Sequence, residues 1–89
     1  MATIKATKAF SEELMSITSL KVERDLRRSV EALQSFPELG SSKMPESIKR
    51  LYGNNVRKIS VAPFLLIYDY SKKEDAITLY GLIHTRTVR

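Results

Sequence analysis

The sequence predicts an α+β fold, in which an N-terminal strand and a two-helix hairpin precede a three-stranded antiparallel meander. All strands are expected in one small twisted sheet with the helices on one face. In the first half of the chain, apolar residues recur at helical spacing along one stripe, at Val22, Leu26, Val30 and Leu33. After Asn55 the pattern changes to β-rich runs separated by short turn sequences. Helices and hairpins segregated in this way indicate an α+β layer rather than βαβ units.

The N-terminal third is expected to hold a short strand within residues 3–10, followed by a helix. Ser11 is the predicted N-cap, since the carboxylates of Glu12 and Glu13 would then lie in the first turn, where they favour the helix dipole. Ser19 is a second predicted cap, and it would start the helix that carries the apolar stripe. That helix must end before Pro37, because a residue that precedes proline avoids the α region.

The C-terminal half is expected to form three strands, at residues 56–61, 64–70 and 76–83. Ala62-Pro63 and the charged residues 71–75 supply the intervening turns. The middle run is apolar at odd and even positions alike, which is typical of a central strand covered on both faces. Between the second helix and these strands, residues 46–51 are expected to form a short helical turn.

Strict alternation along the last strand assigns its side chains to two faces. The set predicted to pack under the helices is Ile77, Leu79, Gly81 and Ile83. The set predicted to lie on the opposite, uncovered face is Thr78, Tyr80, Leu82, His84 and, if the strand continues, Arg86. With Leu65 and Ile67 of the middle strand, this face would expose apolar area of the kind that marks a partner site.

Composition narrows the function classes. The 89 residues suit one domain, 1–89, and a hydrophobic fraction of 43% argues against disorder. The chain has no cysteine, which excludes disulfides and thiolate chemistry, and its single histidine argues against a metal site built from protein ligands. Its glycines are isolated, so no phosphate-binding loop is present. We expect no cofactor and no metal.

The net charge of +5 is unevenly placed. Residues 1–42 carry six Lys/Arg and six Asp/Glu, whereas residues 43–89 carry nine and four, so the second half holds the whole excess. Such a surface either keeps the protein soluble or attracts an acidic partner, nucleic acid or protein. The start of the chain has no long apolar run, and no segment approaches the ~20 apolar residues of a membrane span. We therefore expect a cytoplasmic protein with no membrane partner.

Several segments resemble those of the RelE/ParE superfamily of bacterial toxin–antitoxin toxins, and the likeness covers almost the whole chain. The segments are Phe36-Pro37-Glu38-Leu39-Gly40, Val56-Arg57-Lys58, Ile67-Tyr68-Asp69-Tyr70 and Ile83-His84-Thr85-Arg86. In order, they resemble a "Pro-x-Leu-Gly" turn, the "leu-Arg" opening of the second strand, an "ile-Tyr-Arg-Val" strand and a terminal "His-x-Arg" signature. The resemblance implies the toxin of a type II toxin–antitoxin system with a role in plasmid stabilisation. It also implies a small acidic antitoxin as partner.

The family implies two different activities. RelE-like members cut mRNA on the ribosome, and ParE-like members poison DNA gyrase. For an RNase, the matching candidates here are Arg86, His84 and Lys58. The arginine expected early in the third strand falls on Leu65, and the C-terminal aromatic residue is missing. The turn at residues 37–40 and the His-x-Arg end favour the ParE side. A metal-independent endoribonuclease, or a non-toxic binding module, is the alternative.

The candidate residues for binding a partner or nucleic acid lie on the three C-terminal strands and at the chain end. They are Arg57, Lys58, Leu65, Ile67, Tyr80, Leu82, His84 and Arg86. Arg57 and Lys58 must point to opposite faces, so at most one of them shares a face with Arg86. His84 is either a candidate for acid–base work, for which histidine is a suitable residue type, or a strand-end histidine that bonds the backbone.

Overall fold

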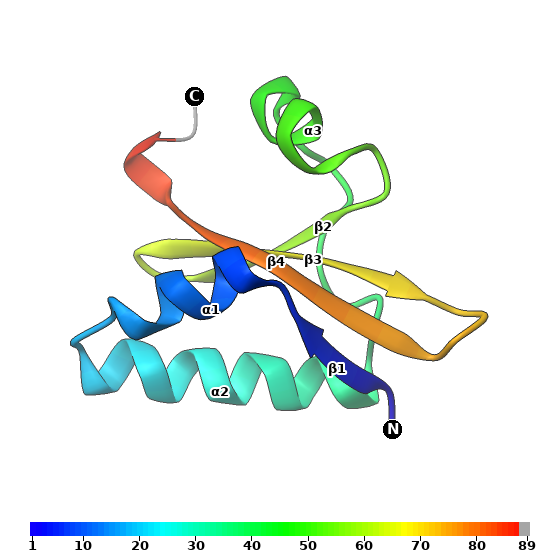
Figure 1. Ribbon diagram of the computed structural model, residues 1–89, viewed down its shortest axis with the longest axis horizontal. Coiled ribbons are helices and arrows are strands. Elements are labelled where there is room, and N and C mark those ends of the chain that lie inside the picture. The colour runs from blue at the N-terminus through cyan, green and yellow to red at the C-terminus, as the bar shows by residue number, and fades with distance from the viewer. Residues whose placement is uncertain (88–89) are drawn as a thin grey trace.

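Figure 1 shows the protein as a computed structural model, which describes residues 1–87. Its elements in chain order are β1 (Thr3–Ala6), α1 (Lys8–Met15), α2 (Leu20–Ser35), α3 (Glu46–Tyr52), β2 (Arg57–Val61), β3 (Phe64–Ser71), β4 (Ala76–His84) and a 3-10 turn (Thr85–Thr87). The strands form one sheet in the order β1-β4-β3-β2. β1 runs parallel to β4, and the other two pairings are antiparallel. The predicted α+β class and element order are confirmed.

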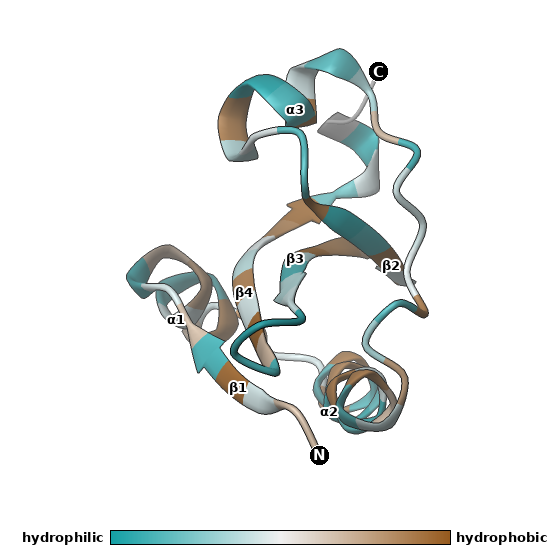
Figure 2. Ribbon diagram, turned by 90° about the vertical axis from the view of Figure 1, so that its right-hand side faces the viewer, coloured by the Kyte–Doolittle hydropathy of each residue, from teal (hydrophilic) through white to brown (hydrophobic). Residues whose placement is uncertain are grey.

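The helices do not all lie on one side of the sheet. α1 and α2 cover one face, and α3 lies over the other, at the same end of the molecule as the C-terminus (Figures 1 and 2). The expectation of an uncovered second face is therefore wrong. The short helix expected at residues 46–51 is present, but its role as a cover could not be predicted from the sequence.

α2 matches its prediction closely. The Ser19 side chain accepts a hydrogen bond from the Val22 amide at 3.3 Å, and the helix ends at Ser35, two residues before Pro37. Its buried residues are Val22, Leu26 and Leu33. Leu26 and Leu33 pack with β-strand side chains in the main core, whose buried members are Ala2, Phe10, Leu26, Leu33, Val61, Leu66, Tyr68, Ile77, Leu79 and Leu82.

α1 begins earlier than predicted. Its N-cap is Thr7, whose hydroxyl oxygen accepts a hydrogen bond from the Phe10 amide at 3.1 Å, and Ser11 lies inside the helix. The same hydroxyl donates to the carbonyl of Tyr80 on β4 at 3.0 Å. This long-range bond adds to the local capping bond at Thr7. The first strand accordingly stops at Ala6.

β4 contains a bulge that reverses its faces. The pairing with β3 passes from Tyr68 opposite Leu79 to Ile67 opposite Gly81, which leaves Tyr80 as the extra residue. Strict alternation holds up to Leu79 and then inverts. Leu82, expected on the uncovered face, is only 5% exposed and belongs to the main core.

The second face carries a smaller core beneath α3. Ile48 of α3 is buried against Val56 and Ile67, and Ile67 is fully buried rather than partly exposed as expected. Partly buried apolar residues surround this second core: Met44, Tyr52, Leu65, Tyr80 and Ile83. The faces assigned to Leu65, Ile67 and Tyr80 are thus as predicted, but α3 covers them.

Candidate functional site

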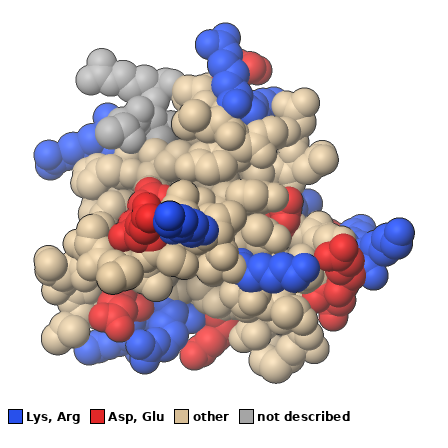
Figure 3. Space-filling model, in the orientation of Figure 1, with Lys and Arg blue, Asp and Glu red and all other residues tan. Residues whose placement is uncertain are grey.

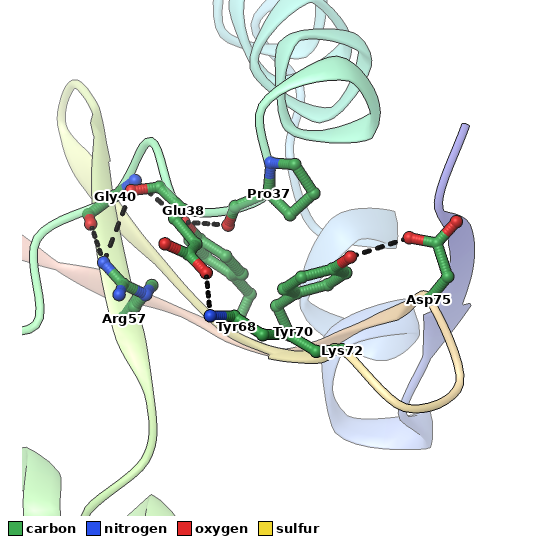
Figure 4. A network of polar contacts seen from close by, with 8 residues as sticks. All are labelled: Pro37, Glu38, Gly40, Arg57, Tyr68, Tyr70, Lys72 and Asp75. Atoms are coloured by element: carbon green, nitrogen blue, oxygen red, sulfur yellow. Dashed lines mark hydrogen bonds and ion pairs between the residues drawn. The ribbon is translucent and has the colours of Figure 1, made fainter.

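The turn at residues 37–40 is fixed by side chains from two strands (Figure 4). The Tyr68 hydroxyl on β3 donates to the Pro37 carbonyl at 3.0 Å and accepts from the Gly40 amide at 2.8 Å. Nη1 of Arg57 on β2 donates to the carbonyls of Glu38 and Gly40, at 3.3 and 2.8 Å. Three of the segments that resemble toxin motifs therefore meet in one structural network.

Position 40 of this network has no room for a Cβ, so it requires glycine. A Cβ at this position would lie 2.6 Å from the Tyr68 hydroxyl and 2.7 Å from the Lys58 carbonyl. Tyr68 is fully buried, and burial raises the pKa of its hydroxyl above the ordinary value. Tyr68 is therefore part of the scaffold and is not available for stacking on a base.

The two basic residues that open β2 face opposite ways. Arg57 is paired in register with Tyr68, on the side of α1 and α2, whereas Lys58 is paired with Ile67, on the side of α3. The Lys58 backbone forms two hydrogen bonds of 2.9 Å with Ser41, which joins the linker before α3 to the edge of the sheet. Arg57 is thus committed to the turn, and Lys58 lies near the covered face.

His84 lies at the end of β4, opposite Phe64 in register. The two rings meet edge to face, with centroids 5.5 Å apart. The Arg86 amide donates to Nδ1 of His84 at 3.2 Å, so Nδ1 is the acceptor in this contact. The Arg86 side chain belongs to the 3-10 turn and is exposed. This contact agrees with the interpretation of His84 as a strand-end histidine that bonds the backbone.

The three residues proposed for an RNase are not gathered on one face. His84 shares the face of Phe64 and the main core, whereas Lys58 shares the face of Ile67 and the second core. The sheet separates the two side chains. The reason is the bulge at Tyr80, which places His84 on the opposite face from that given by strict alternation.

Under α3, two tyrosines lie side by side. The Tyr80 hydroxyl donates to the carboxylate of Asp69 at 2.8 Å, and this bond raises the pKa of Tyr80. The rings of Tyr80 and Tyr52 are tilted, with centroids 6.0 Å apart. Burial, with a smaller effect from Glu13, raises the pKa of Tyr52. Tyr80, a candidate for partner contact, is thus held between the sheet and α3.

The sequence reasoning missed an open apolar groove of about 490 Å³ along the helix hairpin. It lies between α1 and α2, and its lining includes Phe10, Leu14, Met15, Ile17, Leu26 and Val30. Met15 is 85% exposed, and Leu20 nearby is 75% exposed. The available signal was an excess of large apolar residues in the hairpin connection, beyond those on the helical stripe.

Charges on the face seen in Figure 3 are interleaved. Lys and Arg side chains occur at several places on this face, many of them beside Asp or Glu, and some of them touch one another at its edges. Within residues 1–87, no helix is long and apolar enough to cross a membrane. In the same part of the chain, no group of three or more His, Asp or Glu side chains could hold a metal ion.

These features define a small α+β domain in which a helix hairpin packs on one face of a four-stranded sheet. Residues 4–89 match the family model for the ParE toxin of type II toxin–antitoxin systems, parDE. The chain belongs to this family of toxins, within the RelE/ParE superfamily.

Solved structures show the same fold. One is the toxin–antitoxin complex RelBE of E. coli, with a TM-score of 0.72, 11% identity, and 94% of this chain and 96% of that chain covered. Another is a metal-bound toxin from Helicobacter pylori, with a TM-score of 0.68, 23% identity, and 97% of each chain covered. No curated protein sequence matches the chain.

Proposed function

We propose that this toxin arrests growth by acting on DNA gyrase, and that a small acidic antitoxin neutralises it in the cytoplasm as part of a plasmid-stabilisation system. Membership of the ParE family supports the toxin role. On the face in Figure 3, basic side chains are interspersed with acidic ones, and such a face attracts nucleic acid less than a continuous basic surface does.

The observation that carries the choice of target is the separation of His84 from Lys58 by the sheet. Cleavage of RNA needs a proton donor or acceptor and a cation that stabilises the developing charge, both within reach of one phosphate. Leu65 supplies no cation at the position where RNase-type members carry arginine. Of the RNase candidates, Arg86 alone is exposed at the strand end and open to a phosphate.

For the antitoxin, the groove between α1 and α2 offers the apolar surface that the sheet does not. An amphipathic helix can place its apolar side chains in a groove of this kind. Leu14 and Met15, which line this groove, would then be covered by the antitoxin rather than by this chain. The complex in the RelBE structure supports an antitoxin partner in general, not this particular groove.

Two assays with the purified protein and one in cells test the proposal. We expect induced expression without antitoxin to arrest growth, and the protein to inhibit supercoiling by gyrase while a defined message in a translation extract stays intact. Cleavage of the ribosome-bound message that Arg86→Ala abolishes would overturn the choice of gyrase and favour the endoribonuclease. Normal growth at high soluble yield would overturn the toxin role and favour a binding module.

A further inference from the structure

Two open grooves lie side by side where α2 ends and β3 meets the following turn. One, of about 720 Å³, is lined by Ser35, Phe36, Pro37, Glu38, Leu39, Tyr70 and Lys72. The other, of about 420 Å³, is lined by Glu38, Ser42, Asn54, Asn55, Val56, Arg57, Tyr70 and Lys72. They share Glu38, Tyr70 and Lys72, so the Glu38–Lys72 ion pair of 3.1 Å lies along their common border. We call the first the apolar groove and the second the polar groove.

The apolar groove displays large side chains on a rigid support. Phe36 is 67% exposed and Leu39 is 54% exposed. Leu39 belongs to the 37–40 turn that Tyr68 and Arg57 hold with four hydrogen bonds to its backbone, and Phe36 immediately precedes this turn. Because the backbone here is already ordered, less conformational freedom is lost when these apolar side chains bind a partner, which favours an effective contact surface.

The polar groove has an excess of positive charge. Its charged groups are Arg57, Lys72 and Glu38, so the sum is +1. The Arg57 guanidinium is oriented by the bonds from Nη1 to the turn, and Arg57 is one of the residues that line the groove. The exposed side chains of Asn54 and Asn55 add amide donors. Such a set favours a carboxylate, which guanidinium binds through charge-assisted hydrogen bonds.

The two grooves also fix which part of a ligand each of them can bind. The apolar groove lies at the C-terminal end of α2, where the helix dipole disfavours an anion. A bound carboxylate therefore belongs in the polar groove, and an apolar side chain belongs beside Phe36 and Leu39. The shared border at Lys72 keeps the two positions adjacent.

We propose that the two grooves together bind an extended acidic segment of a partner chain, with an apolar side chain in the apolar groove and an adjacent Asp or Glu in the polar groove. Under the proposed function, on which this identification of the partner rests, the segment belongs to the acidic antitoxin. It would lie at the far end of α2 from the groove between α1 and α2, so one antitoxin chain could contact both ends of the helix.

A library of short displayed peptides, selected against the full-length protein, tests the site directly and does not require the partner itself. We expect enriched peptides to pair Asp or Glu with a nearby Leu, Ile or Phe. Fluorescence anisotropy should show binding about tenfold weaker or worse for Leu39→Ser and for Lys72→Glu, and weakening with salt. The matched controls are Leu51→Ser on α3, where Leu51 is 73% exposed, and Lys73→Glu, the exposed neighbour of Lys72 that lines neither groove.

Both controls should bind within about twofold of the unchanged protein, and equal thermal midpoints establish that all four variants are folded. The proposal is overturned if no peptides are enriched, if the enriched peptides lack carboxylates, or if their binding ignores Leu39→Ser and Lys72→Glu. Growth arrest is scored separately. Site variants that still arrest growth support an antitoxin site, whereas folded variants that lose toxicity would assign the grooves to the target instead. If the protein binds the peptides but its expression never arrests growth, the proposed function is overturned while the binding site in the two grooves is retained.

Discussion

The hydroxyl of Tyr68 accepts a hydrogen bond from the amide of Gly40 at 2.8 Å, across 28 positions of the chain. This contact joins two of the segments that resemble toxin motifs, the turn and the central strand. Arg57 completes the same network from β2. The residues that give this chain its family likeness thus stabilise the fold, and they say less about the target than the exposed residues do.

Removing the Tyr68 hydroxyl should destabilise the protein. Tyr68→Phe leaves the buried Gly40 amide without its acceptor, so we expect a loss of about 1–3 kcal/mol in the free energy of unfolding. Urea denaturation measures it. Tyr70→Phe is the matched control, because Tyr70 loses one exposed hydrogen bond to Asp75. Equal effects of the two substitutions would contradict the structural role of Tyr68.

Two glycines without room for a Cβ should respond differently to alanine. At Gly40 the obstacles include the Lys58 carbonyl at 2.7 Å, which is backbone, so Gly40→Ala should cost ~2 kcal/mol or more. At Gly81 the nearest atom is the Tyr52 hydroxyl, also at 2.7 Å, at the end of a side chain that can rotate away. Gly81→Ala should therefore loosen α3 with a smaller global cost.

Amide hydrogen exchange distinguishes the two glycine variants. In Gly81→Ala, exchange should rise within α3 while the main core stays protected. In Gly40→Ala, protection should fall throughout, in line with the lower global stability. Unchanged exchange in α3 for Gly81→Ala would show that Tyr52 does not hold this helix to the sheet.

Because Tyr68 is buried, the stability of the folded protein should fall as the pH becomes alkaline. Burial raises its pKa above the ordinary 10.0, so above that pH the unfolded chain releases the proton first. The contribution of Tyr68 to the free energy of unfolding is fully present below the pKa that Tyr68 has in the unfolded chain. It is lost as pH rises through the pKa that Tyr68 has in the folded protein. Unfolding measured across this window should become easier with rising pH, less steeply in Tyr68→Phe. The same slope in both proteins would remove Tyr68 as a cause.

Thr7 should matter more than an ordinary helix cap. Its hydroxyl caps α1 and also donates to the Tyr80 carbonyl at the bulge, so Thr7→Val should cost ~1–3 kcal/mol. Ser19→Ala removes a cap alone, and about 1 kcal/mol is expected. Thr7→Ser keeps both bonds and serves as the control. Thermal or urea unfolding of the three variants gives the ranking, and equal losses at Thr7 and Ser19 would refute it.

Charge reversal at Arg86 should weaken association more than truncation does, if this exposed residue contacts an anionic group of a partner. Truncation loses a charge-assisted hydrogen bond, worth roughly 1.5–3 kcal/mol, and Arg86→Glu adds repulsion that salt screens. Antitoxin affinity at two salt concentrations, compared between Arg86→Ala and Arg86→Glu, measures this effect. Unchanged affinity together with retained growth arrest would show that Arg86 is an ordinary surface residue and not part of the binding site.

Local signals are sufficient for some of the fold. α2 is predictable because Ser19, the apolar stripe and Pro37 each indicate the same helix and act within a few residues. The predicted start of α1 is too late because Thr7 and Ser11 are both good caps. Thr7 also bonds Tyr80, more than seventy positions away, and the sequence shows nothing of that contact.

The candidate site is harder to predict, because single residues decide it through distant contacts. One extra residue, Tyr80, moves Leu82 into the main core and His84 to the face opposite Lys58. In the sequence Arg57 resembles a free basic residue in a strand, and only the fold brings the carbonyls of the 37–40 turn to it.

Because α3 belongs to the same chain as the sheet, it covers one face of β3 even when the protein is not in a complex. β3 is the most apolar strand, and a run of this kind left bare on one face would favour aggregation. Ile48 closes that face from within the same polypeptide, against Ile67. Under the proposed function, the toxin then needs no chaperoning by its antitoxin at this strand.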